Sequence, residues 1–431
     1  MRIAIFTDTY IPDKNGIVTS IDRFTRLMAD EGHQIMIFCP KSGHFKDKNY
    51  PGISVKRYIS FSAPSYKDMN IALPFVMTVI KDLREFEPDL VHIQTPIGIG
   101  WIGLWAAKIM KVKNIQTYHT YIPDFLVYFQ PKTLFGIDRM ANHINSSRLI
   151  KALVEADISK ESYSSAKFQV YLGQRIREIT ENVSKNSSNK LTNRFGRDFT
   201  KVLYNRADLV LTPTKVMKNV LLKQGVKAKI EVVSNGIEYD LFKKKTDYSI
   251  KNKIIHLGRL GYEKNVDVII QAFKIALQTN PKLTLDILGD GPAKKSLQTL
   301  TKSLGLSKSI KFRGAYDIKK VSQQLCEYDC FVTASTIETQ GLVILEAMAS
   351  GLPVLGVKKF AIPEVVLHGK NGYISKPFDD KGMAANMIKI LESEKRLKEF
   401  GHKSLTIAKT HEIIECKNRL MHFYEKVAGK K

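Results

Sequence analysis

Residues 335–353 read STIETQGLVILEAMASGLP, and this stretch decides how the rest of the chain is interpreted. It follows the apolar run Cys330–Thr333, which is typical of a buried strand, and its second half has the composition of a helix. A strand, a turn and a helix are therefore predicted in succession. The backbone amides of Gly341, Leu342 and Val343 fall at the N-terminus of that helix, where unpaired donors and the helix dipole favour a bound phosphate.

Two glutamates stand on either side of this turn. Glu338 precedes the helix, with Thr339 and Gln340 after it in the loop, and Glu346 lies two turns further along. A loop carboxylate can accept hydrogen bonds from sugar hydroxyls, and a carboxylate on the helix can accept them from a ribose. Two acidic residues at this spacing are common by chance. Together with the glycines of the turn and of the helix end they form a strong signal for binding.

Short β-branched apolar runs alternate with helical patterns along nearly the whole chain. Each run is followed by Gly, Pro, Asn or Asp, as expected for buried parallel strands. Alternation of strands and helices predicts right-handed crossovers and doubly wound sheets. The predicted strands cover residues 3–6, 35–38, 90–93, 115–118, 209–212, 230–233, 254–257, 283–288, 310–312, 330–333 and 354–357.

Two such series in succession predict an α/β chain with two Rossmann-like domains. We expect the first domain at residues 1–240 and the second at 250–411, with a hinge at 235–246, where a turn is followed by charged, unpatterned sequence. A last helix within 412–431 has no strand after it and could cap either domain. No strand is evident between the fourth and fifth runs, so residues of about 125–204 are expected to form a helical insertion in the first domain.

Length and charge restrict the class of protein. A chain of 431 residues fits two domains, and Lys+Arg 67 against Asp+Glu 42 gives a net charge of +25. Such a charge favours anionic partners, namely a phosphorylated small molecule, nucleic acid or an anionic membrane surface. Four scattered cysteines favour a reduced compartment. We expect no signal peptide and no membrane span, because no apolar stretch approaches the ~20 residues that a bilayer requires.

The segment 125–204 is dense in basic residues, with 13 basic and 7 acidic side chains. Its apolar residues recur at helical spacing beside three basic residues, as shown by Leu172, Ile176, Ile179, Val183, Lys167, Arg175 and Arg177. One interpretation is a helical elaboration packed on the first domain. The other is a basic amphipathic surface for a membrane or for acyl chains.

A glycine pattern in the first domain needs a separate interpretation. The run Gly98-Ile-Gly100-Trp-Ile-Gly103 fits the dinucleotide pattern G-x-G-x-x-G after a strand. It does not stand at the first strand–helix turn, where a dinucleotide-binding domain carries it. Close packing of a helix on the sheet is the interpretation we favour.

The paired glutamates resemble the motif of the family-4 retaining glycosyltransferases, which have the GT-B fold of two Rossmann-like domains facing a cleft. The segment 256–265, HLGRLGYEKN, is similar to the opening of that family's second domain. The resemblance implies that Arg259 and Lys264 grip the donor diphosphate. It also implies that the loop ending at Gly16 faces the phosphates and the acceptor, and that 338–343 and Glu346 bind the donor.

A narrower resemblance points to the acceptor. The segments 15–20, 117–121 and 338–342 look like those of the bacterial diacylglycerol glycosyltransferases. In this resemblance His119 matches a histidine beside the acceptor and the donor sugar, so His119, Glu338, Arg259 and Lys264 are the expected catalytic residues. The expected acceptor and membrane residues are Tyr10, His119, Lys167, Arg175 and Arg177.

The resemblance implies transfer of a hexose from a UDP-sugar to diacylglycerol, at the cytoplasmic face of the membrane. The UDP-sugar is a substrate, and no cofactor is expected. No metal is expected either, since no Asp-x-Asp triplet occurs. A different lipid of the phosphatidylinositol type, or a soluble or polysaccharide acceptor, remains open. A nucleic-acid-binding protein would use the positive charge, but the sequence lacks a helix-turn-helix or an aromatic RNA-binding signature, so nucleic acid is not an expected partner.

Overall fold

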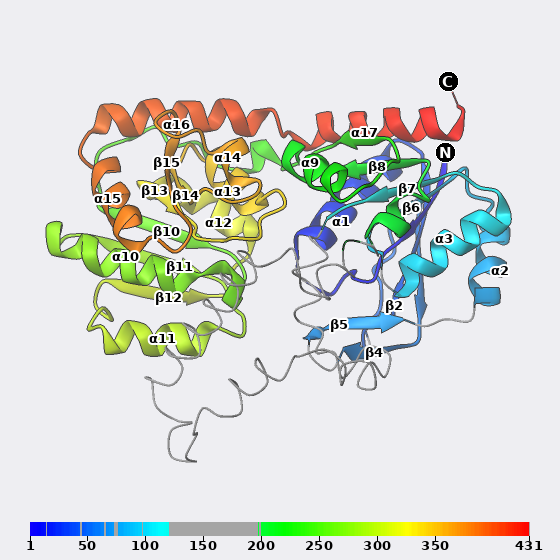
Figure 1. Ribbon diagram of the computed structural model, residues 1–431, viewed down its shortest axis with the longest axis horizontal. Helices are drawn as coiled ribbons and strands as arrows, with labels where there is room; N and C mark the ends of the chain where they lie inside the picture. The colour runs from blue at the N-terminus through cyan, green and yellow to red at the C-terminus, as the bar shows by residue number, and fades with distance from the viewer. Residues whose placement is uncertain are drawn as a thin grey trace, which may run out of the picture.

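A computed structural model describes residues 1–119 and 200–430, without 14, 44, 64, 65, 73–75 and 97, and also describes residue 197. These residues form two parallel sheets with helices on both faces, lying side by side (Figure 1). Nearly all of the expected insertion, including Lys167, Arg175 and Arg177, lies outside the described residues. The predicted fold class is confirmed.

The first sheet has seven parallel strands in the order β3-β2-β1-β6-β7-β8-β9. Successive strands run outward from β1 in one direction and from β6 in the other, so the order reverses between β1 and β6. In doubly wound sheets ligands bind beyond the carboxyl ends of the strands at such a point. The strands are β1 (Arg2–Phe6), β2 (Gln34–Pro40), β3 (Ile53–Tyr58), β6 (Leu90–Ile93), β7 (Asn114–Thr117), β8 (Leu209–Thr212) and β9 (Ile230–Val232).

The helices of this domain are α1 (Gly16–Asp30), α2 (Val76–Phe86), α3 (Gly98–Met110) and α9 (Lys215–Lys223). An antiparallel hairpin, β4 (Ser60–Ala63) and β5 (Tyr66–Ala72), adds a separate small sheet. Neither the hairpin nor β3 was predicted. Strand β3 lies at the edge of the sheet and carries Lys56 and Arg57, which pair with Asp82 and Asp47, so it lacks the apolar run of a central strand.

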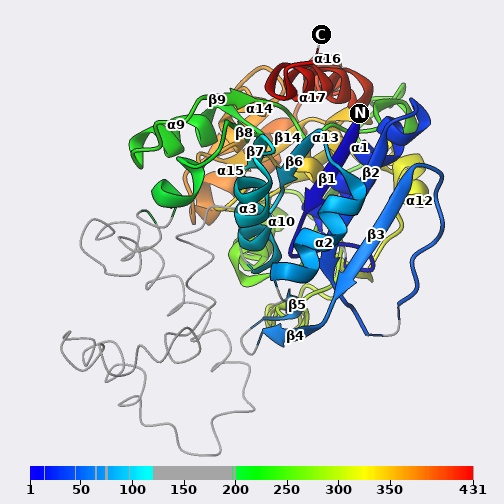
Figure 2. The same cartoon turned by 90° about the vertical axis from the view of Figure 1, so that its right-hand side faces the viewer.

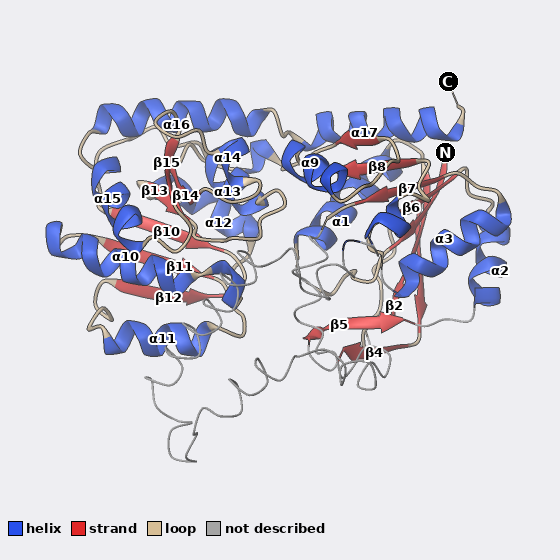
Figure 3. Ribbon diagram, viewed as in Figure 1, coloured by secondary structure: helices blue, strands red, loops and turns tan. Residues whose placement is uncertain are grey.

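The second sheet has six parallel strands in the order β12-β11-β10-β13-β14-β15. Helices flank it on both faces (Figure 3). Its strands are β10 (Lys253–Leu257), β11 (Thr284–Leu288), β12 (Ile310–Gly314), β13 (Cys330–Val332), β14 (Val354–Val357) and β15 (Gly372–Ser375). Its helices are α10 (Val266–Thr279), α11 (Lys294–Ser303), α12 (Ile318–Gln324), α13 (Leu342–Ala349), α14 (Ile362–Val365), α15 (Asp380–Ile390) and α16 (Glu394–Lys409), with short 3-10 turns at Tyr239–Leu241, Tyr262–Lys264 and Leu325–Glu327.

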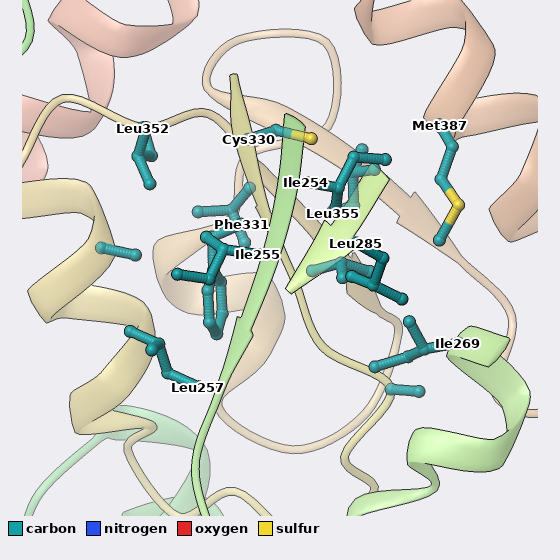
Figure 4. Packing of buried hydrophobic residues seen from close by; sticks show 14 of the residues in the cluster. Ile254, Ile255, Leu257, Ile269, Leu285, Cys330, Phe331, Leu352, Leu355 and Met387 are labelled. Carbon is teal, nitrogen blue, oxygen red and sulfur yellow. The ribbon is translucent and has the colours of Figure 1, made fainter. Parts of the chain in front are cut away.

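Each domain has its own apolar core. In the second domain Ile254 and Leu285 from adjacent strands lie on the same face of the sheet as Ile269 and Met387 of the covering helices, and Phe331 lies on the other face (Figure 4). Two further clusters lie on the two faces of the first sheet. Burial of these continuous apolar strands stabilises both sheets, at about 25 cal/mol for each Å² of apolar surface removed from water.

The chain passes between the domains twice, and the two passages lie together. The Ile237 amide donates to the His411 carbonyl at 2.8 Å, and the Ile413 amide donates to the Ile237 carbonyl at 2.9 Å. Helix α16 covers the second domain, and α17 (Ile413–Ala428) continues along the same side (Figures 1 and 2). Leu420 and Tyr424 of α17 are buried in the core of the first sheet, so this helix caps the first domain, a point that the sequence left open.

Candidate active site

The N-terminus of α13 is built as expected. Gly341 precedes the helix with φ of 78°, a left-handed conformation that favours glycine, and because glycine has no side chain it does not cap the first amides. The amides of Leu342 and Val343 occupy the first turn, where backbone donors have no partner within the helix. This end of the helix provides donors for an anion.

Lys264 and Glu338 form an ion pair beside this helix. Lys264 follows β10 and Glu338 follows β13, and these strands are neighbours in the sheet, so their carboxyl ends meet. Lys264 Nζ donates to Glu338 Oε1 at 2.5 Å, with side chains 21% and 12% exposed. Burial opposes ionisation of Glu338, but the charge and hydrogen bond of Lys264 prevail and lower its pKa. Glu338 is therefore ionised at neutral pH.

Arg259 lies in the same loop after β10. Its guanidinium donates to Glu263 Oε1 at 2.8 Å, and Asn265 ties this loop to the one after β13 by donating to the Ala334 carbonyl at 3.2 Å. The loop after β10 thus brings two cations, Arg259 and Lys264, to the carboxyl end of that strand, next to the end of β13. Positive charge at this place suits a diphosphate.

Thr339 connects this loop to His119 of the first domain. The Thr339 hydroxyl donates to the His119 carbonyl at 2.7 Å, and the Thr214 hydroxyl donates to the Thr339 carbonyl at 2.9 Å. Although 220 residues separate His119 from Thr339, the structure brings them together. The residues next to Glu338 are therefore anchored on the first domain beside His119.

The His119 side chain is held inside the first domain. Its ring is 8% exposed, and Nε2 lies 2.6 Å from Gln94 Oε1. Burial lowers the pKa of His119 to about 4, so the ring is neutral at physiological pH. A neutral imidazole can position a hydroxyl group through one nitrogen while the other nitrogen is held by the protein.

Gly16 begins α1 and faces the second domain. A Cβ at this position would lie 3.4 Å from Leu342 Cδ1, so the glycine loop lies directly against α13. Asn15 caps α1 by accepting from the amides of Ile17 and Val18 at 3.0 Å. Tyr10, expected at the acceptor or membrane surface, is 5% exposed and packs in the core of the first domain instead.

Gln340 points away from the Lys264–Glu338 pair. Its Oε1 accepts from the Asn235 amide at 3.0 Å, and its Nε2 donates to Ser234 Oγ at 2.6 Å. Ser234 in turn lies 2.9 Å from His411 Nδ1. The structure therefore places this side chain against the two interdomain passages, and no direct contact to a donor is needed to explain its burial.

Glu346 is buried on the side of α13 that faces the first domain. Burial raises its pKa, Arg23 of α1 lowers it and Glu238 raises it. Arg23 pairs with Glu238 at 3.1 Å. The two glutamates of the motif thus occupy different surroundings. Lys264 lowers the pKa of Glu338, whereas burial raises the pKa of Glu346. Such a separation is common where two carboxylates have different roles.

The glycine pattern at 98–103 packs a helix closely on the first sheet. A Cβ on Gly103 would lie 2.4 Å from the Phe6 ring, and one on Gly100 would lie 1.7 Å from the Thr95 carbonyl oxygen. The amide of Ile99 is bound by Asp8 at 2.9 Å. Close packing of α3 on β1 accounts for these glycines.

Several residues near His119 were not predicted, namely Gln94, His92, Thr117 and Thr214. His92 and Gln94 are two residues apart at the end of β6, which is otherwise apolar. Polar residues with a period of two in a buried strand need partners inside the protein, and that signal could have marked them.

Comparison with known families agrees with this architecture. Residues 239–405 match the family described as Glycosyl transferases group 1, and residues 14–156 and 180–241 match Glycosyltransferase Family 4. The two matches meet at the interdomain passage and together cover every strand of the two parallel sheets except β1. The chain belongs to the family-4 glycosyltransferases, which have the GT-B fold.

Two relatives and one solved structure are similar to most of this chain. The chain is 26% identical to the alpha-monoglucosyldiacylglycerol synthase of Streptococcus pneumoniae over 400 residues, covering 89% of this chain and 75% of that protein. It is 23% identical to a GDP-mannose-dependent alpha-mannosyltransferase of Corynebacterium glutamicum, covering 88% and 78%. The crystal structure of Anabaena HepE in complex with UDP and glucose has the same fold, with a TM-score of 0.69 at 18% identity over 99% of this chain and 100% of that one.

Proposed function

We propose that this glycosyltransferase moves a hexose from a UDP-sugar to diacylglycerol, with retention of configuration at the sugar. The product is a monoglycosyl diacylglycerol. The observation that carries the proposal is the continuous set of contacts from Lys264 through Glu338 and Thr339 to His119, which brings a charged donor loop against the first domain. Similarity to the alpha-monoglucosyldiacylglycerol synthase of Streptococcus pneumoniae supports the choice of acceptor.

The geometry suits departure of a nucleoside diphosphate. Arg259, Lys264 and the first amides of α13 stabilise the negative charge that develops as the glycosidic bond breaks. Glu338, ionised beside Lys264, accepts hydrogen bonds from sugar hydroxyls and fixes the ring. In a front-side reaction the leaving phosphate takes the proton of the attacking hydroxyl, so no separate base is needed. His119 orients a hydroxyl group near the reacting carbon.

We further propose that the enzyme acts at the cytoplasmic face of the membrane as a peripheral protein. No helix among the described residues combines the length and the apolarity needed to cross a bilayer. Net charge of +25 favours an anionic surface. Vesicle sedimentation with phosphatidylglycerol tests this, using wild type and a variant with Lys167, Arg175 and Arg177 all changed to Glu, at low and high salt. Equal binding of both proteins would show that the 125–204 segment is not the surface that binds the membrane.

The decisive experiment is transfer of radiolabel from UDP-glucose to vesicles that contain diacylglycerol, followed by identification of the lipid product. UDP-galactose, a UDP-uronic acid and GDP-mannose are tested in parallel, because a GDP-mannose-dependent relative exists. Phosphatidylinositol and soluble glycosyl acceptors replace diacylglycerol in further reactions. Label in a glucosylated diacylglycerol supports the proposal. Transfer only from GDP-mannose, or only to another acceptor, would contradict it.

A further inference from the structure

A hydrogen-bonded chain runs behind His119 through the core of the first domain. Gln94 Oε1 contacts His119 Nε2 at 2.6 Å, and Gln94 Nε2 contacts His92 Nδ1 at 3.1 Å. His92 Nδ1 also binds the hydroxyl of Tyr424 on α17, and His92 Nε2 lies 2.6 Å from Thr117 Oγ1. All five side chains are buried. The chain therefore joins the C-terminal helix, β6 and β7 to the ring of His119.

The chemistry of the amide determines where the protons lie. The carbonyl oxygen of Gln94 can only accept, so His119 Nε2 must carry a hydrogen and donate. The amide nitrogen of Gln94 can only donate, so His92 Nδ1 must be the acceptor. His92 Nε2 then carries its hydrogen and donates to Thr117 Oγ1. In this arrangement the single lone pair of His92 Nδ1 is shared between two donors, the Gln94 amide and the Tyr424 hydroxyl.

Both histidines are neutral, which the chain requires. Burial lowers the pKa of His92 to about 3, and His119 adds to this effect. Burial also lowers the pKa of His119 to about 4. A neutral imidazole has one N–H and one acceptor nitrogen, so a hydrogen on Nε2 leaves Nδ1 of His119 as an acceptor.

We propose that Gln94 is a positioning residue that holds His119 in the Nε2–H tautomer, with His92 fixing the orientation of the Gln94 amide. His119 then offers Nδ1 to accept a hydrogen bond from a hydroxyl of the donor sugar or of the acceptor. This inference rests on the proposed function, because it assigns Gln94 a role only through His119. The amide suits this task, because its oxygen faces His119 and its nitrogen faces His92, and exchange of the two would require the opposite tautomer of both histidines.

The tautomer can be observed directly. Protein with ¹⁵N-labelled imidazoles gives long-range ¹H–¹⁵N correlations that distinguish a protonated from an unprotonated ring nitrogen, and His119→Asn assigns the signal among the ten histidines. In wild type we expect His119 with Nε2 protonated and Nδ1 unprotonated at neutral pH. The tautomer is read from the wild-type protein, in which all the hydrogen-bonded side chains are intact, and the His119→Asn variant serves only to assign the signal. An Nδ1–H tautomer or a doubly protonated ring would overturn the proposal.

Substitution of Gln94 tests the consequence. Gln94→Met keeps the shape of the side chain and removes both polar atoms, so we expect mixed tautomers of His119. We expect kcat to fall by about 10- to 100-fold, the range found when the outer partner of a functional histidine is lost. The KM for UDP-glucose should change little. Gln116→Met is the matched control, because Gln116 is a buried glutamine on β7 whose amide donates to the Leu203 carbonyl and not to a histidine. It should keep both the tautomer and kcat.

The outcomes separate this inference from the proposed function. If Gln94→Met is folded and retains the wild-type tautomer and kcat, Gln94 does not position His119. If His119→Asn retains near wild-type transfer, the role of His119 itself is wrong, whatever its tautomer. If no sugar is transferred to any lipid by wild type, the proposed function fails, while the wild-type spectrum still reports the hydrogen-bonded chain.

Discussion

Glu338 and Lys264 define the chemistry of the site at the scale of single residues. Partial burial of a carboxylate and an ammonium costs desolvation free energy. The attraction between the two groups, which are 2.5 Å apart, offsets part of that free energy. The pair lies beside the uncapped first turn of α13. Donor binding would engage both groups, the ammonium with phosphate and the carboxylate with hydroxyls. Pairing in the free protein holds both side chains in place.

We predict that Glu338→Ala and Arg259→Ala each lower the rate of sugar transfer by about 10²–10³, the usual effect of removing one preorganised polar contact in an active site. Both variants should remain folded, because neither residue belongs to an apolar core. Steady-state rates with the purified variants measure the loss. Glu392→Ala removes a glutamate from an exposed ion pair with Arg396 and serves as the control. Near wild-type turnover in Glu338→Ala or Arg259→Ala would exclude the assigned role.

At the scale of elements, α3 shows how one helix sets the geometry of the first domain. Its glycines allow the helix axis to approach β1 closely, and Asp8 at the end of β1 holds the first turn through the Ile99 amide. Asp8 also bonds Thr95, which follows β6. The carboxyl ends of β1 and β6 are thereby joined at the point where the strand order reverses, close in the sheet to β7 and His119.

The stability of a Gly103→Ala variant should show whether the close packing of α3 or the higher helix propensity of alanine dominates. Propensity alone predicts that alanine stabilises a helix by about 1 kcal/mol relative to glycine. The structure predicts the opposite sign, a loss of about 1–3 kcal/mol, because the new Cβ would lie 2.4 Å from the Phe6 ring. Urea unfolding measures the free energy of unfolding. Lys108→Ala on the exposed face of the same helix should change it by less than ~0.5 kcal/mol, and a stabilised Gly103→Ala would refute the packing account.

At the scale of the whole molecule, three buried histidines make stability depend on pH. Burial lowers the pKa of His92 to about 3 and those of His119 and His256 to about 4. An unfolded histidine titrates near pH 6.5, so between about pH 6.5 and 4 the unfolded chain binds more protons than the folded one. Stability is therefore fully present above about pH 6.5 and is lost as the pH falls through this window.

We predict a melting temperature clearly lower at about pH 5 than at about pH 7, with each buried histidine contributing roughly 1–2 kcal/mol to the loss. His256→Gln should reduce the dependence, since glutamine can still donate to the Val332 carbonyl and does not titrate. His422→Gln, at an exposed position on α17, should leave the dependence unchanged. Identical pH dependence in His256→Gln and wild type would show that burial of this histidine does not couple to stability.

We also predict that transfer needs no added divalent metal. In the proposed reaction Arg259, Lys264 and the amides of α13 stabilise the charge of the departing diphosphate, which is the task that a metal ion performs in other transferases. Activity measured after extensive treatment with EDTA should equal that of the untreated enzyme. Complete loss in EDTA, restored by manganese or magnesium, would contradict this expectation.

The central strands of both sheets were predictable because buried parallel strands are continuous apolar runs, which are local in sequence. The edge strand β3 was missed because it carries charged residues, and β15 because its sequence, Gly-Tyr-Ile-Ser from Gly372, is not a continuous apolar run. The turn before α13 was predictable for a similar reason. Gly341 and the helix after it are adjacent in the chain, so their geometry depends on local backbone preferences.

The sequence alone determined which residues carry charge and hydrogen-bonding groups, and where strands give way to helices. Only the tertiary structure decided which of these groups meet. Glu338 pairs with Lys264 because β13 lies beside β10, and the two residues are 74 positions apart. Gln340 is adjacent to the donor loop yet binds Ser234, and His119 depends on Gln94. Such contacts depend on strand order and on the directions of buried side chains, and no local pattern encodes either.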